Sequence, residues 1–197
     1  MKSLSLSMLL LMLVTAPTLR AAADEDPDVQ KAEAERAARL KAIKQRMKYF
    51  ESHVGEWAGE ETYQLTVGDR QKSVTKDEWK GLFSLDGTHF EMHGEGTDQE
   101  GGKTTYKWIC TYDPETENYR AWYFDSNGNT DEFEMEWDDG EKTLLWTSED
   151  DEQDRVSTFT MKVTDNEITG KGETTRASDD ETLIVHSMKY KRKRIRI

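Results

Sequence analysis

The chain has 197 residues, with 27 Lys or Arg against 40 Asp or Glu and a formal net charge of -13. This length is enough for one domain of ordinary size and excludes two independent cores. The acidic balance argues against nucleic acid or an anionic membrane surface as a partner.

Residues 1–23 have the pattern of a secretory signal peptide. A positive start at Lys2 is followed by an apolar run from Met8 to Val14 and by small residues at Ala21 and Ala23. The apolar run is too short to cross a bilayer, so we expect cleavage after Ala23 and no membrane insertion. The mature protein is expected to be secreted or periplasmic.

Residues 24–54 are predicted to form one long helix. Pro27 follows Asp26, as at many helix starts, and neither Pro nor Gly interrupts the chain as far as Val54. The first half offers only alanines and charges and is predicted to be solvated, although a coiled-coil dimer through it stays open. The second half carries an apolar stripe that must dock on something, at Leu40, Ile43, Met47, Phe50 and Val54.

Residues 55–197 are predicted to form an all-β domain. From Trp57 onward the apolar period is two, and turn sequences such as "LDGT", "DPETEN" and "SNGN" separate the segments. The segments predict strands at 56–66, 72–85, 88–95, 103–112, 118–125, 129–137, 142–147, 154–164, 167–175 and 181–195. Because every connection is short, we expect an antiparallel up-and-down meander that closes into a ten-stranded β-barrel and so removes both edges.

Closure would place the last predicted strand beside the first. The last is basic in "KYKRKR", whereas the first carries Glu56, Glu60 and Glu61. Opposite charges across a strand pair help to fix register.

The Gly-x-Trp of Gly55 and Trp57, the helix before it, the meander and the arginine-bearing last strand resemble the calycin superfamily of lipocalins, fatty-acid-binding proteins and nitrobindins. More narrowly, "HVGEWAGEETY", "CTYDPETENYRAWYFDSNGN" and "MKYKRKR" resemble a bacterial family of secreted proteins of unknown function. The resemblance implies that Trp57 plugs the closed end of the barrel. It also implies that Arg192 or Arg194 stacks on the Trp57 ring.

The predicted strands are rich in aromatic residues, which indicates either a filled core or a cavity for an apolar ligand. The candidate ligand-binding residues are Trp108, Trp122, Phe133 and Trp146, with Arg120 as an inward charge that could anchor an acidic ligand. Arg120 could equally face outward and pair with the acidic surface. Cys110 alternates with aromatic residues and is predicted to be a buried small residue rather than a nucleophile.

Three further patterns could indicate a metal or haem site. His89, Glu91, His93 and Glu95 share one face of a strand, where a His and a Glu two residues apart could share a metal, but a solvated strand face is the favoured interpretation. "DSNGNTDEFEME" imitates a calcium loop, but its sixth position is Thr130 in place of Gly, so we interpret Asn127-Gly128 as a hairpin turn. His186 lies near the C-terminus, where nitrobindins carry their haem ligand, and the resemblance is one of location only.

The leading hypothesis is therefore a secreted barrel without catalysis or cofactor that binds a small apolar or amphipathic molecule. One alternative is a haem or nitric-oxide module through His186. The other is an enzyme of unknown reaction, which requires His89, Glu91 or His93 to point into the barrel.

Overall fold

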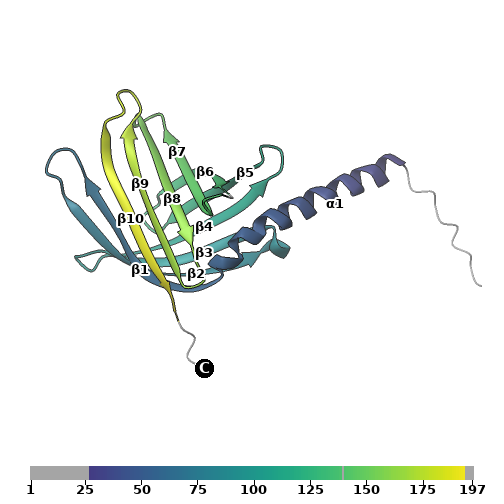
Figure 1. The fold of residues 1–197 in the computed structure, drawn as a ribbon, viewed down its shortest axis with the longest axis horizontal. Helices are drawn as coiled ribbons and strands as arrows, with labels where there is room; N and C mark the ends of the chain where they lie inside the picture. The colour runs from purple at the N-terminus through teal and green to yellow at the C-terminus, as the bar shows by residue number, and fades with distance from the viewer. Residues whose placement is uncertain (1–26, 139, 194–197) are drawn as a thin grey trace, which may run out of the picture.

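The computed structural model describes residues 27–138 and 140–193 and shows a closed antiparallel barrel of ten strands preceded by a helix (Figure 1). The predicted fold class is thereby confirmed, and the predicted strand ends agree with the structure within three residues. The predicted signal peptide and Arg194 lie outside the described residues. The elements are α1 (Pro27–Met47), η1 (Lys48–His53), β1 (Gly55–Leu65), β2 (Lys72–Ser84), η2 (Leu85–Gly87), β3 (His89–Thr97), β4 (Lys103–Asp113), β5 (Asn118–Asp125), β6 (Thr130–Asp138), β7 (Thr143–Asp150), β8 (Arg155–Val163), β9 (Glu167–Arg176) and β10 (Thr182–Arg192).

Each strand pairs with its sequence neighbours, and β10 closes the barrel on β1. The register places Trp57 opposite Arg192 and Glu60 opposite Lys189. The expectation that acidic residues of the first strand face basic ones of the last therefore holds for Glu60, although the Lys189 ammonium makes an ion pair with Glu167 at 3.0 Å. It is wrong for Glu61, which faces Met188 and points into the barrel.

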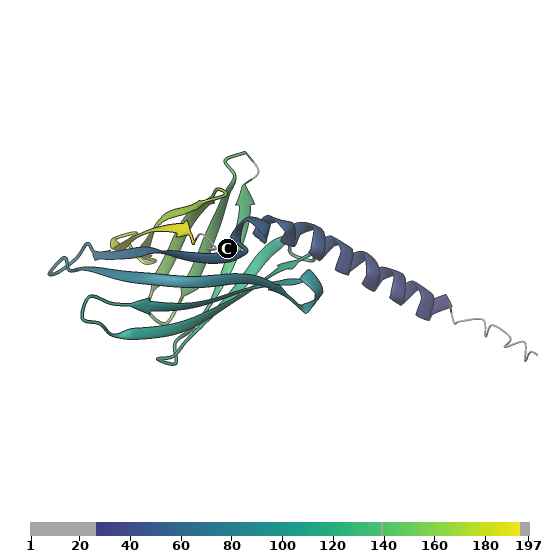
Figure 2. The same ribbon diagram turned by 90° about the horizontal axis from the view of Figure 1, so that it is seen from below.

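Helix α1 projects from one end of the barrel (Figures 1 and 2). Residues 27–41 are all exposed, as the alanine- and charge-rich sequence predicts. The apolar stripe is fully buried only at Met47 and Phe50, which are 0 % and 1 % exposed, whereas its first and last members, Leu40 and Val54, stay exposed. In the described part of the chain no helix is both long and apolar enough to cross a membrane.

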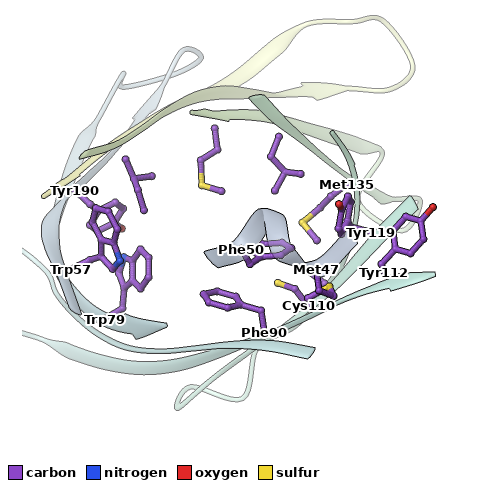
Figure 3. Close-up of a cluster of buried hydrophobic side chains, with 14 residues drawn as sticks. Met47, Phe50, Trp57, Trp79, Phe90, Cys110, Tyr112, Tyr119, Met135 and Tyr190 are labelled. Carbon is purple, nitrogen blue, oxygen red and sulfur yellow. The ribbon is translucent and has the colours of Figure 1, made fainter. Parts of the chain in front are cut away.

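The predicted single helix changes geometry at Met47, where the tighter 3₁₀ segment η1 begins. In a 3₁₀-helix residues three apart lie one above the other, and Phe50 and His53 are both buried. Phe50 stacks on Phe90 with ring centroids 5.0 Å apart, in the middle of the ring of strands (Figure 3). Segment η1 therefore fills the end of the barrel from which α1 departs.

Candidate ligand-binding cavity

Trp57 lies at this filled end and is fully buried. Its ring stacks on Trp79 with centroids 5.5 Å apart, and its indole N–H donates to the carbonyl of His53 at 2.9 Å. The Arg192 guanidinium carbon lies 4.3 Å from the centroid of the Trp57 ring, within cation–π range. Arg192 also donates from Nη2 to the carbonyl of Ser52 at 2.7 Å, which ties the last strand to η1.

Gly55 begins β1 with a φ of +123°, a conformation that residues with a Cβ rarely adopt. A Cβ built there would lie 2.7 Å from Arg192 Nη1. The glycine of the Gly-x-Trp pattern thus leaves room for the guanidinium that covers the tryptophan.

A cavity of about 530 Å³ lies inside the barrel beyond this filled end. Its wall includes Trp108, Phe133 and Trp146, three of the residues predicted to bind a ligand. They form one cluster, since the Trp108 ring centroid lies 4.9 Å from those of both Phe133 and Trp146. Cys110 also lines the cavity and is 2 % exposed, and burial raises the pKa of its thiol to about 12, as suits a buried small residue.

Arg120 and Trp122 do not reach this cavity. Their neighbours Tyr119 and Ala121 are buried inside the barrel, so the alternation of the strand turns Arg120 and Trp122 outward. Arg120 pairs there with Glu132, and its guanidinium lies 5.6 Å from the Trp122 ring centroid. The prediction that these two residues face the ligand is wrong, and the outward alternative for Arg120 is correct.

The polar side of the cavity is a network of two carboxylates and three tyrosines. The Tyr190 hydroxyl lies 2.5 Å from Glu61 Oε1 and 2.6 Å from Asp77 Oδ2. The Tyr106 hydroxyl lies 2.6 Å from Asp77 Oδ2, and the Tyr63 hydroxyl lies 2.9 Å from Glu61 Oε2. Strands β1, β2, β4 and β10 thus bring five hydrogen-bonding side chains together.

Three hydroxyl hydrogens cannot serve these four hydroxyl–carboxylate contacts when both carboxylates are ionised. A proton on Glu61 or Asp77 supplies the missing hydrogen. Burial favours that proton, because it raises the pKa of Glu61 and raises the pKa of Asp77 to about 6. The network therefore holds a proton more readily than two solvated carboxylates would.

His186 lines the cavity next to this network. Its ring lies between Tyr63 and Phe159, with centroid distances of 4.0 Å and 4.6 Å. Its Nε2 lies 3.8 Å from Glu61 Oε2, is buried, and has no hydrogen-bond partner among the described residues. Burial lowers the pKa of His186 to about 4, so the imidazole is neutral at neutral pH.

The strand face of His89, Glu91, His93 and Glu95 lies outside the barrel. Glu91 pairs there with His93 at 2.9 Å and with Lys107 at 2.8 Å, while Phe90 on the opposite face is buried. The condition set for an enzyme built on this face is therefore not met. The described residues contain no group of three or more His, Cys, Asp or Glu able to hold a metal.

The calcium-like sequence forms the β5–β6 hairpin, as the turn interpretation predicts. Asp125 Oδ1 accepts the backbone N–H groups of Asn127 and Asn129 at 2.8 Å and 3.0 Å. Gly128 has a φ of +87°. Asp125 Oδ1 therefore stabilises the hairpin turn by accepting its backbone N–H groups.

Sequence reasoning missed Glu61, Asp77, Tyr106 and Tyr190 as members of the cavity. A signal for two of them was present. Glu61 lies four residues after Trp57, and Asp77 lies two before Trp79, so in each strand the carboxylate shares the face of a buried tryptophan.

No protein-family model and no curated protein match this chain. Among solved structures, the S-type phycobiliprotein lyase CPES from Guillardia theta superposes with a TM-score of 0.54 at 12 % identity, covering 75 % of this chain and 92 % of that one.

Two other solved structures resemble the chain more weakly. The first is EF1p2_mFAP2b bound to DFHBI, with 9 % identity, 75 % and 98 % coverage of the two chains and a TM-score of 0.38. The second is a protein of unknown function of the DUF3598 family from Nostoc punctiforme, with 7 % identity, the same coverage and a TM-score of 0.22. At these identities the similarity extends to the fold alone.

Proposed function

We propose that this protein is an exported, non-catalytic barrel that binds a small apolar or amphipathic molecule. The observation that carries the proposal is the cavity of about 530 Å³ with the Trp108–Phe133–Trp146 cluster on its wall. Small-molecule sites are typically concave, largely apolar and equipped with a few polar groups that orient the ligand. The network around Glu61 and Asp77 provides such groups in the same cavity.

Two tryptophans offer a matched test, because one lies inside the barrel and the other outside. N-phenyl-1-naphthylamine, a neutral aromatic dye, is expected to bind saturably, with increased fluorescence. Trp108→Leu should weaken its binding by about tenfold, since an aromatic contact contributes about 0.5–1.5 kcal/mol beyond its area. Trp122→Leu, on the outer face, should leave the affinity within about twofold.

Equal losses in the two variants would place the dye elsewhere than in the cavity. Absence of saturable binding to the native chain would contradict the proposal itself. Mass spectrometry of small molecules that co-purify from the native host would then identify the natural ligand or show that none is carried.

A second candidate function is haem binding through His186, and the unpartnered Nε2 of that side chain favours it. A neutral imidazole with a free nitrogen fits an axial iron ligand. Both ring faces are covered by Tyr63 and Phe159, so only the Nε2 edge is open, and Glu61 Oε2 lies 3.8 Å from it. The acidic neighbour at that edge makes this the weaker candidate.

Added haem would show a Soret band that His186→Ala abolishes and His93→Ala, on the outer face, preserves. A band that persists in His186→Ala would exclude His186 as the iron ligand. Titration followed by absorbance measures both outcomes.

A further inference from the structure

The cavity is lined by acidic side chains from five strands, and no lysine or arginine of the described residues lines it. The acidic members are Glu61, Asp77, Asp125, Asp131 and Glu173. The two histidines of the lining are neutral at neutral pH, because burial lowers the pKa of His53 to about 3 and that of His186 to about 4. The lining of the cavity therefore carries carboxylate groups and no positively charged side chain at neutral pH.

Asp77 shows where a donor is missing. The residue is 3 % exposed, and its Oδ2 receives the hydroxyls of Tyr106 and Tyr190. Its Oδ1 is buried and has no hydrogen-bond partner among the described residues. A buried acceptor left without a donor is unfavourable, and more so when it is charged, so a donor brought in by a ligand would recover that cost.

We infer that the ligand of this cavity is an organic cation, an apolar or aromatic body that carries a protonated amine or amidine set against Asp77 and Glu61. The inference rests on the proposed function and names the class of molecule bound. An ammonium group supplies both the missing hydrogen-bond donor and the countercharge.

An anionic amphipath such as a fatty acid fits this lining poorly. Its carboxylate would enter a buried space that already holds Glu61 and Asp77, with no lysine or arginine of the described chain on the wall to pair with it. Burying a further unpaired charge of the same sign is strongly unfavourable.

The barrel rim at the end opposite η1 also carries negative charge. Five hairpin connections meet there, at residues 66–71, 98–102, 126–129, 151–154 and 177–181. Four of these connections carry acidic residues, Arg70 is the single basic residue within the five, and Arg176 beside the last one pairs with Asp179 and Glu181. A mouth of one charge sign concentrates ligands of the opposite sign and raises their association rate.

The test uses three molecules that share a naphthalene ring and differ in the polar group attached to it: 2-naphthylmethylamine (cationic), 2-naphthalenemethanol (neutral) and 2-naphthoate (anionic). Isothermal titration of the full chain near neutral pH is expected to show the amine binding at least about tenfold more tightly than the alcohol, with the carboxylate weakest. An alcohol or carboxylate that binds as tightly as the amine, or an amine that does not bind, would overturn the inference. Saturable binding of N-phenyl-1-naphthylamine in the same preparation would show that the proposed function survives that result.

Two conservative variants assign the preference to the inner carboxylates. Asp77→Asn and Glu61→Gln should each reduce amine affinity about tenfold while leaving that of the alcohol within about threefold. Glu60→Gln is the matched control, because Glu60 neighbours Glu61 on the outer face opposite Lys189 and should change neither. An amine preference that persists in both inner variants would remove Asp77 and Glu61 from cation recognition.

Discussion

Replacement of Trp57 by alanine is expected to lower the free energy of unfolding by about 3–5 kcal/mol. The residue is fully buried, stacks on Trp79 and lies under the Arg192 guanidinium. The substitution opens a cavity at the filled end of the barrel and leaves the His53 carbonyl without the indole donor. Urea unfolding followed by circular dichroism measures the loss.

Trp122→Ala provides the control, because it removes the same side chain from the outer face of the barrel. Its cost is expected to stay at or below about 1 kcal/mol, as for surface positions in general. A loss of less than about 1 kcal/mol for Trp57→Ala would show that the tryptophan does not support the closed end.

The second prediction concerns pH and Asp77. Burial raises the pKa of Asp77 from 3.8 to about 6 in the folded protein, against hydrogen bonds from Tyr106 and Tyr190 that lower it and with Glu61 adding to the rise. Between these two pKa values the folded protein binds more protons than the unfolded chain, so this group's contribution to stability falls as the pH rises. Relative to Asp77→Asn, the native chain should therefore lose about 2–3 kcal/mol of unfolding free energy between about pH 4 and about pH 7.

Urea unfolding of both proteins across this pH range gives the difference directly, and the titrations of groups remote from the Glu61–Asp77 network cancel. The corresponding difference for Glu60→Gln, an exposed position on the outer face, should stay nearly flat. A difference between native and Asp77→Asn that is constant, or that grows in favour of the native chain with rising pH, would show that Asp77 is not held against ionisation.

The fold was predictable because local sequence patterns indicate each of its strands and turns. Alternation with a period of two, interrupted by turn residues every eight to twelve positions, indicates strands, and short connections allow only antiparallel neighbours. The end of the α-helix was harder to predict. A long run without Pro or Gly does not indicate that the α-helix ends at Met47 and that a 3₁₀-helix follows it. Packing of Phe50 against Phe90 on a distant strand accompanies that change.

The candidate site was only partly predictable, for a physical reason. In "NYRAWYFD" aromatic residues occupy both faces of β5, so its sequence alone does not say whether Trp122 or Tyr123 faces inward. Pairing across the barrel decides it and places Tyr123 on the cavity wall. In β1, by contrast, Glu61 shares the face of the buried Trp57, so strand alternation alone places its side chain inside the barrel.

The contacts that close the barrel have a consequence for folding. Arg192 and Ser52 hydrogen-bond across 140 residues of sequence, and β1 has no partner on one side until β10 arrives. Such long-range pairing slows folding, because a large loop must be ordered before the contact stabilises anything. During synthesis the cavity cannot form until β10 has left the ribosome and paired with β1, so the proposed ligand would bind only after closure and would not guide the folding of the earlier strands.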